Sequence, residues 1–176
     1  LALGAGVSGL DRNSAQGDRK ILDVLCAFGA ELIEDGSSIR VSLANLHGTE
    51  IDASDIPDLV PVICAVAATA DGTTKIYNAT RLRLKESDRI KSTVEMINSL
   101  GGDAHETEDG IIINGRKSLS GGMVESFNDH RIVMAAAVAS QKCENCVIIN
   151  NAQAVNKSYP EFFKDFNSLG GDANVM

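Results

Sequence analysis

Cations gather in one short stretch of this chain, where they could bind an anion. Residues 81–91 hold five lysine or arginine residues, although the whole chain carries only 16 of them against 24 aspartates and glutamates. The stretch leads into apolar residues at helical spacing, namely Ile90, Val94, Ile97 and Leu100. Its cations therefore stand at a predicted helix N-terminus, where the macrodipole opposes positive charge and favours an anion. An anionic ligand held by arginines and backbone N–H groups would explain this placement. A solvated charged turn is the simpler alternative.

Two further cations stand close to predicted helix starts. Arg131 follows Asp129, and Lys157 precedes Pro160. Asp129 fits an ordinary N-cap and Pro160 an ordinary first helical residue, but neither explains the cations. We expect Arg89, Arg131 and Lys157 to converge on one open surface as a clamp for carboxylate or phosphate, which arginine binds with two parallel hydrogen bonds. Surface ion pairs spread over unrelated loops are the alternative.

Four more side chains near these cations could take part in chemistry. Lys85 would add a fourth cation, and His130 a group that donates or accepts a proton near neutral pH. Asp58 and Glu86 are carboxylates that would lie beside the bound anions and the cations. In such surroundings one carboxylate can act as a base and another as an acid. Asp58 could also be an ordinary N-cap.

The composition limits the partners of the chain. Its 176 residues carry a formal charge of −8 and are 44% hydrophobic, which is typical of a folded protein rather than a disordered one. A nucleic-acid surface needs a broad excess of lysine and arginine, and stacking of bases needs aromatic side chains, which make up only 4% here. No apolar run reaches the roughly 18 residues of a membrane span. We therefore expect neither nucleic acid nor a membrane as a partner.

The four cysteines indicate thiols rather than a metal site. Cys143 and Cys146 have the spacing of metal ligands, but no second pair or nearby histidine completes a tetrahedral site, so no metal is expected. Cys26 and Cys64 fall on apolar helix faces and are expected to be small core residues. Since no signal peptide is visible, we expect reduced thiols and a cytoplasmic location.

The elements that would position these residues repeat along the chain. Three predicted helices end before a glycine and an acidic residue, at Gly29, Gly101 and Gly170, which are 72 and 69 residues apart. Each glycine is predicted to take the left-handed conformation that ends a helix. Two apolar helices are predicted over residues 59–70 and 130–140, and they should be buried because they are apolar on all sides.

Short strands are predicted beside these helices. They combine alternating or continuous apolar residues with turn residues at their ends. The predicted strands are Ser38–Leu43, Thr73–Tyr77, Ile111–Asn114, Gly122–Ser126 and Cys146–Asn150. Together with the helices they give a β-α-β-α-β-β unit that repeats at about 70 residues, with two copies and a part in the chain.

This pattern predicts an α+β fold with repeated β-α-β-α-β-β units, buried helices and outer sheets. Residues 1–176 are expected to form a single domain, because no glycine- or proline-rich linker marks an internal boundary. The chain starts at Leu1 with no methionine, so we expect it to be a piece of a longer protein.

Five motifs in this order resemble the EPSP synthase (3-phosphoshikimate 1-carboxyvinyltransferase) family, from about residue 9 to the end. They are Ser14-Ala15-Gln16-Gly17-Asp18, Ile56-Pro57-Asp58, Lys85-Glu86-Ser87-Asp88-Arg89, Asn128-Asp129-His130-Arg131 and Asn156-Lys157-Ser158-Tyr159-Pro160. The resemblance implies an enzyme that transfers the enolpyruvyl group of phosphoenolpyruvate to the 5-hydroxyl of shikimate 3-phosphate and releases phosphate. This is a step of the shikimate pathway of aromatic amino acid biosynthesis, and it implies no metal or cofactor.

The resemblance also implies an enolpyruvyl transferase-like fold and roles for single residues. Such enzymes have two domains of three β-α-β-α-β-β units each, with the substrates in the cleft between them. This chain is similar to the C-terminal domain, so its partner would be the N-terminal domain of the same protein, without which it is expected to be inactive.

Residue roles follow from the same motifs. Asp58 resembles the acid that contacts the shikimate ring and accepts a proton, Glu86 a proton donor, and Lys85 the lysine at shikimate 3-phosphate. Arg89, Arg131 and Lys157 resemble the cations that bind phosphoenolpyruvate in the family, and His130 would lie beside them. A further position of the family that can contact shikimate 3-phosphate corresponds to a residue near Arg81, and we assign no such role to Arg81 itself.

Three other functions agree with parts of the sequence. The related transferase that acts on UDP-N-acetylglucosamine has the same fold and the same enol donor, although the third and fourth motifs favour the shikimate enzyme. A non-catalytic anion-binding module would use the cations but not Asp58 and Glu86 together. A plain structural domain would bind neither phosphate nor phosphoenolpyruvate.

Overall fold

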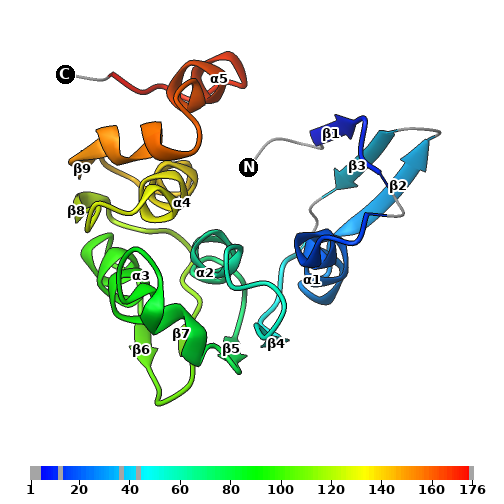
Figure 1. The fold of residues 1–176 in the computed structure, drawn as a ribbon, viewed down its shortest axis with the longest axis horizontal. Coiled ribbons are helices and arrows are strands. Elements are labelled where there is room, and N and C mark those ends of the chain that lie inside the picture. Colours follow the sequence, from blue (N-terminus) through cyan, green and yellow to red (C-terminus); the bar gives the residue numbers. More distant parts are fainter. Residues whose placement is uncertain (1–4, 12–13, 36–37, 43–44, 175–176) are drawn as a thin grey trace.

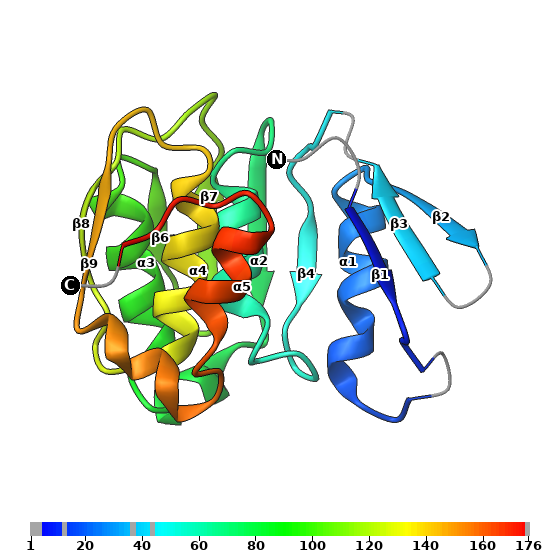
Figure 2. The ribbon, with the colours of Figure 1, turned by 90° about the horizontal axis from the view of Figure 1, so that it is seen from above.

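Small β-sheets lie around a group of helices in the computed structural model (Figures 1 and 2). The structure describes residues 5–11, 14–35, 38–42 and 45–174. The strands are β1 (Ala5–Ser8), β2 (Glu31–Asp35), β3 (Ser38–Ser42), β4 (Glu50–Asp52), β5 (Thr73–Tyr77), β6 (Ala104–Glu106), β7 (Ile111–Asn114), β8 (Gly122–Glu125) and β9 (Val147–Asn150). The α-helices are α1 (Ile21–Ala27), α2 (Val60–Ala67), α3 (Arg89–Ser99), α4 (His130–Ser140) and α5 (Phe162–Ser168). Short 3-10 helices are η1 (Gly17–Lys20), η2 (Thr80–Leu84) and η3 (Ala152–Lys157).

One complete repeat unit runs from β4 to β7. Its elements follow in the order β4-α2-β5-α3-β6-β7, which is the predicted β-α-β-α-β-β unit. Strand β5 pairs in parallel with β4 and antiparallel with β7, and β7 pairs antiparallel with β6. The sheet order is therefore β4-β5-β7-β6. The predicted α+β class is confirmed.

Parts of the same unit flank the complete one. Strands β1, β3 and β2 form an antiparallel sheet in the order β1-β3-β2, with α1 between β1 and β2, and this matches β5-β7-β6 with α3. Strands β8 and β9 pair in parallel on either side of α4, as β4 and β5 do on either side of α2. The described residues thus contain one complete unit between two partial ones, rather than two copies and a part, because the unit begins at β4.

Glycines end the helices as predicted. Gly29, Gly101 and Gly170 have φ angles of 91°, 83° and 97°, and they follow directly on the residues that close α1, α3 and α5. These values lie in the left-handed region, where a side chain would be strained. The three helix ends are therefore built alike.

An asparagine fixes the turn after two of these helices. The Asn98 side chain donates to the carbonyl of Ala104 at 2.9 Å and accepts from its N–H at 2.8 Å. Asn167 makes the same pair of bonds with Ala173, again at 2.9 Å and 2.8 Å. We call each pair an asparagine clasp. It sets the position at which the chain leaves the helix, which at Ala104 is the start of β6.

The core lies between the sheets, where α2 and α4 pass. In Figure 2 these helices lie between the β8-β9 sheet on one side and β4 with the β1-β3-β2 sheet on the other. Side chains such as Ile63, Cys64, Ile132 and Ala136 are at most 1% exposed. The predicted burial of both apolar helices is confirmed, and so is that of Cys64.

The prediction for Cys26 is wrong, because this residue is exposed. Helix α1 turns Val24 and Phe28 toward the core. A residue midway between two positions that lie four apart in a helix points to the opposite side. The remaining element predictions are close to the observed bounds: α4 and β7 match, β9 begins one residue later, and Leu43 lies outside the described residues.

Candidate functional site

Asp129 joins the start of α4 to the start of α3. It caps α4 by accepting a hydrogen bond from the backbone N–H of Arg131 at 2.9 Å. It also receives the Arg89 guanidinium on both oxygens, at 2.8 Å from Nε and 3.2 Å from Nη2. Only 1% of the Arg89 side chain and 0% of the Asp129 side chain are exposed. A buried ion pair with two hydrogen bonds thus connects residues that are 40 apart in the sequence.

The charges of this pair stabilise each other. Burial alone would raise the pKa of Asp129, but the hydrogen bond from Arg89, that from the Arg131 N–H and the charge of Arg89 outweigh it, so the pKa is lowered. Burial would likewise lower the pKa of Arg89, yet the bond to Asp129 and the carboxylate charges raise it. Asp129 is therefore ionised at neutral pH.

Two more carboxylates bind the same guanidinium. Nη1 of Arg89 lies 2.6 Å from Oδ1 of Asp58, and Nη2 donates to Oε2 of Glu86. Arg89 therefore faces carboxylates of its own chain rather than an open surface, which corrects the expectation for this residue. The physical reason is that a buried guanidinium needs acceptors for its fork of donors, and three carboxylates supply them.

Asp58 is the carboxylate on which the cations meet. Besides Arg89, it lies 3.2 Å from Nζ of Lys85 and 3.7 Å from Nη2 of Arg131. Burial raises the pKa of Asp58, but the hydrogen bonds from Lys85 and Arg89, with the charges of Lys85 and Arg131, outweigh it, so the pKa lies below its ordinary value. The side chain is 35% exposed, so a ligand can reach it.

Asp58 is not an N-cap. Helix α2 begins at Val60, its preceding residue is Leu59, and no side chain caps it. The carboxylate that could have capped the helix is instead held by three cations from three other places in the chain. The alternative that Asp58 is an ordinary cap is therefore wrong, whereas Asp129 is a cap and an ion-pair partner at once.

His130 and Arg131 follow Asp129 in the first turn of α4. The His130 ring is buried, and its Nδ1 lies 4.0 Å from Oδ1 of Asp129, without a hydrogen-bond partner among the described residues. Burial lowers the pKa of His130 more than the nearby Asp129 raises it, so the ring is neutral at pH 7. The Arg131 side chain is 31% exposed, and its Nε is also unpartnered in the described part of the chain.

Lys157 reaches the same place from a different element. It is the last residue of η3, not the first of a helix, because α5 begins only at Phe162. The expectation that its charge stands at a helix start is therefore wrong. Its Nζ donates to the carbonyl of Asn128 at 2.5 Å, one residue before Asp129. This contact links Lys157 to the turn directly before α4, the helix that begins with His130 and Arg131.

The structure brings all the predicted site residues into one connected network, which we call the charge cluster. Its members are Asp58, Lys85, Glu86, Arg89, Asp129, His130, Arg131 and Lys157. The cations meet because α3 and α4 begin side by side, and not because they stand on equivalent elements of the repeat. The roles of these residues remain predictions.

Two features of the surroundings escape sequence reasoning. The sequence indicates Asp129 as a cap but not its bond to Arg89, because no local pattern reveals a partner 40 residues away. Ser87 is the second: its hydroxyl donates to Oδ2 of Asp129 at 3.0 Å and lies 3.0 Å from the hydroxyl of Ser92. Its place inside the third motif is the signal that could have found it.

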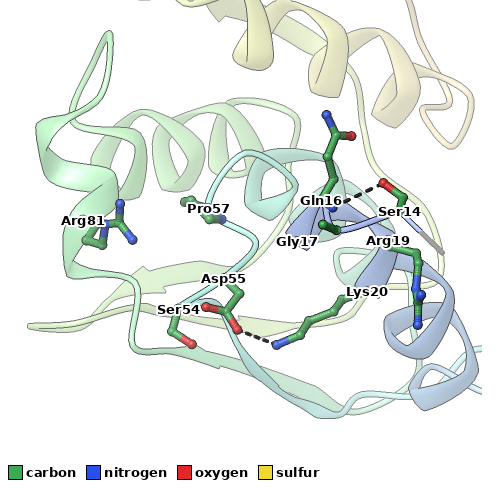
Figure 3. A pocket seen from close by; sticks show the side chains of 10 residues that line it. Ser14, Gln16, Gly17, Arg19, Lys20, Ser54, Asp55, Pro57 and Arg81 are labelled. Atoms are coloured by element: carbon green, nitrogen blue, oxygen red, sulfur yellow. Dashed lines mark hydrogen bonds and ion pairs between the residues drawn. The ribbon is translucent and has the colours of Figure 1, made fainter.

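A polar pocket adjoins the charge cluster at Pro57. Its cavity volume is about 640 Å³. Figure 3 shows Arg81 on one side of it and Arg19 with Lys20 on the other, where Lys20 pairs with Asp55 at 2.7 Å. The Arg81 side chain is exposed and makes no hydrogen bond or ion pair with the described residues, so its charge is available to a ligand. The lining residues are Ser14, Ala15, Gln16, Gly17, Arg19, Lys20, Ser54, Asp55, Pro57 and Arg81.

The described part of the chain holds neither a metal-binding group nor a membrane-spanning helix. No three or more histidine, cysteine, aspartate or glutamate side chains there are placed to hold a metal ion. Cys143 and Cys146 are free thiols. None of the helices in those residues has the length and apolar character that a membrane crossing requires.

Comparison with known proteins gives a consistent picture. The EPSP synthase (3-phosphoshikimate 1-carboxyvinyltransferase) family matches residues 5–166. The 3-phosphoshikimate 1-carboxyvinyltransferase of Clostridium novyi is 50% identical over 162 residues, which are 92% of this chain and 37% of that protein. That of Methanocorpusculum labreanum is 44% identical over 172 residues, 98% of this chain and 41% of the relative. The chain thus spans about 40% of the length of such relatives.

Solved structures agree. An EPSP synthase from Acinetobacter baumannii superposes with a TM-score of 0.83 at 28% identity, over 94% of this chain and 41% of that one. The enolpyruvyl transferase NikO from Streptomyces tendae gives 0.77 at 17% identity, over 95% of this chain and 38% of its own, and shares the fold. The motifs, the repeat units and the match over residues 5–166 lead to one conclusion: this chain belongs to the EPSP synthase family.

Proposed function

We propose that this chain is part of an enzyme that transfers the enolpyruvyl group of phosphoenolpyruvate to the 5-hydroxyl of shikimate 3-phosphate and releases phosphate. The observation that carries the proposal is the meeting of Lys85, Arg89 and Arg131 on Asp58, which places cations and a partly exposed carboxylate at one point. Both substrates are anions, and the reaction moves protons. A cluster with both kinds of group fits them.

The exposed cations are proposed to bind the substrates. Lys85 would hold shikimate 3-phosphate, and Arg131 and Lys157 would hold phosphoenolpyruvate, with His130 beside them. The unpartnered Nε of Arg131 supports this role, since a buried donor without an acceptor is stabilised by a ligand that supplies one. Arg89 would contact phosphoenolpyruvate only after Asp58 or Glu86 has moved away from it, because its donors are bound to carboxylates.

Asp58 is proposed as the base and Glu86 as the acid. Adding an alcohol to an enol phosphate requires removal of the hydroxyl proton and protonation of the methylene carbon. The tetrahedral product then loses a methyl proton and phosphate, so the same groups can act in reverse. The cations would offset charge on the departing phosphate.

The substrates themselves would prepare Asp58 for this role. In the described structure Lys85 and Arg131 lower its pKa, which makes it a weak base. When phosphate and carboxylate groups of the substrates take over these cations, the stabilisation of the charged carboxylate falls and its pKa rises. A base is most effective when its pKa approaches the working pH. Binding of both anions would therefore switch on the base.

The active site is proposed to be shared with a second domain. Residues 1–176 would form a single domain, similar to the C-terminal domain of the family, and the N-terminal domain of the same protein would be the partner. The length comparison supports this, because the chain spans 37% and 41% of two relatives. A cytoplasmic location is proposed on the basis of the free thiols among the described cysteines.

Phosphate release tests the proposal. Both substrates are given first to this chain alone and then to the chain with the separately made N-terminal part of the protein. We expect release only from the mixture, because a half-site lacks the closure that aligns the reactants and excludes water. Release by the chain alone would contradict the shared site. Transfer to UDP-N-acetylglucosamine, but not to shikimate 3-phosphate, would contradict the substrate.

A further inference from the structure

The segment that carries Lys85 and Glu86 is held from outside the charge cluster by Arg83. Nη1 of Arg83 lies 3.0 Å from Oδ2 of Asp88 and 3.3 Å from Oε2 of Glu106. Nη2 donates to the backbone carbonyls of Thr107 at 2.9 Å and Glu108 at 3.4 Å. Both terminal nitrogens are thus occupied by groups that lie on the hairpin between β6 and β7 or at the start of α3.

Asp88 ties this contact to α3. Its Oδ1 accepts from the backbone N–H of Lys91 at 3.2 Å and caps the helix, while its Oδ2 binds Arg83. Residues 84–87, which begin with the last residue of η2, therefore form a short loop that one ion pair between Arg83 and Asp88 closes. Leu84 in this loop is 89% exposed, so apolar packing does not hold it in place. Polar contacts hold it instead, namely the ion pair that joins its ends and, inside it, the bonds of Glu86 with Arg89 and of Ser87 with Asp129. Together they determine where Lys85 points.

The hairpin turn also holds the start of the segment. The backbone N–H of Asn78 donates to the Asp109 side chain at 3.1 Å, and that of Ala79 to the Asp109 carbonyl at 2.6 Å. Gly110 lies so close to β5 that a Cβ there would be 1.9 Å from the carbonyl oxygen of Ile76. The turn over residues 107–110 is thus fixed against β5. It holds residues 78–87 at two places, at Asn78 and Ala79 where they begin and at Arg83 in their middle.

We propose that Arg83 is a positioning residue for the transfer reaction. It holds the loop over residues 84–87 so that the Lys85 ammonium group stays at Asp58, 3.2 Å away, where a substrate anion can replace the carboxylate as its partner. Arg83 does not touch the substrate, because its terminal nitrogens are bound to Asp88, Glu106 and the turn. This inference rests on the proposed function, since it gives Lys85 a substrate to bind.

Steady-state kinetics on the full-length enzyme that contains this chain test the inference. Arg83→Gln should lower kcat/KM by about tenfold or more, because misplacing a binding group by about 1 Å can cost up to about a hundredfold. Arg83→Lys should restore only part of the loss, since a point charge cannot bridge two carboxylates and two carbonyls. Arg116→Gln is the matched control: Arg116 makes an exposed ion pair with Asp103 at 3.6 Å and none with residues 84–88, and its loss should leave kcat/KM unchanged.

A double mutant separates positioning from a general loss of stability. If Arg83 acts through Lys85, then Arg83→Gln combined with Lys85→Ala should fall within about threefold of Lys85→Ala alone. Losses that multiply would overturn the inference, and so would an Arg83→Gln enzyme with unchanged kcat/KM.

A second variant decides the matter if Arg83→Gln does not fold. Asp88→Ser keeps a good cap for α3 but removes the carboxylate that binds Arg83. Like Arg83→Gln, Asp88→Ser should lower kcat/KM, and adding it to Lys85→Ala should cause little further loss. An unchanged kcat/KM for Asp88→Ser, or losses that multiply in the double mutant, would overturn the inference. A wild-type enzyme that releases no phosphate would refute the proposed function and this inference with it, whereas an active wild type with indifferent variants would refute the inference alone.

Discussion

The starts of α3 and α4 are built alike and used differently. Each helix follows an aspartate cap, Asp88 or Asp129, and each has an arginine in its first turn. The Arg89 side chain is 1% exposed and bound by three carboxylates, whereas that of Arg131 is 31% exposed and lies 3.7 Å from Asp58. An arginine that opposes a helix dipole can thus be balanced by its own chain or be left for a ligand. Only the first kind should hold the fold together.

Removing the buried arginine should have the largest effect. Arg89→Met fills a similar volume but leaves the Asp129 carboxylate buried without its partner, which should lower the free energy of unfolding by about 3–5 kcal/mol. Arg131→Met, the matched change at the other helix start, should lower it by no more than about 1 kcal/mol. Urea denaturation of both variants measures the difference. Equal losses would show that the two arginines are not used differently.

Asp58→Asn should have the next largest effect, on turnover. In the complete enzyme it should reduce kcat by on the order of a hundredfold, with substrate binding kept within roughly tenfold, because the amide keeps the shape but cannot take a proton. Asp103→Asn is the control, since Asp103 is a carboxylate of similar exposure that pairs with His105 and Arg116. A change confined to KM would indicate that Asp58 positions the substrate and is not the base.

Arg131→Lys should have a smaller effect, on binding. A point charge replaces a two-pronged donor, so the affinity for phosphoenolpyruvate should fall by about tenfold. The KM for shikimate 3-phosphate serves as the internal control and should stay the same, since Lys85 is proposed to hold that substrate. Calorimetric titration with phosphoenolpyruvate measures the affinity. An affinity that does not change would show that Arg131, although partly exposed, does not hold phosphoenolpyruvate.

The smallest effect should come from His130 and depend on pH. Its pKa is lowered in the folded chain, chiefly by burial, with Arg131 and Arg89 adding to the lowering while Asp129 and Glu86 oppose it. The neutral ring therefore contributes stability that is present above its unfolded pKa of about 6.5 and is lost as the pH falls toward the folded value.

The variant His130→Gln should remove this part of the pH dependence between about pH 7 and 5. Thermal unfolding of the wild type and of the variant at several pH values measures the difference. If His130→Gln left the wild-type curve unchanged, burial of the neutral ring would contribute nothing to the pH dependence of stability.

Much of the fold could be predicted from the sequence, because helix burial and strand alternation are local patterns. The apolar run that forms α4 predicts its observed bounds, and the three helix-ending glycines are recognisable from their spacing. The site could be predicted less completely. Its residues are identifiable, yet the burial of Arg89 is not, because its partners Asp58 and Asp129 lie 31 and 40 residues away. Lys157 is misplaced for a related reason, since nothing local distinguishes the end of η3 from the start of α5.

The asparagine clasps have a consequence for how the chain folds. Each clasp joins two residues that are only six apart in the sequence, Asn98 with Ala104 and Asn167 with Ala173. Short loops close quickly and with little loss of chain entropy, whereas pairing β5 with β7 must wait for residues far apart to meet. The clasps can therefore fix the direction in which the chain leaves a helix before any sheet exists. Helix α1 has Cys26 at the corresponding place, three residues before its glycine, so its turn should form later in folding.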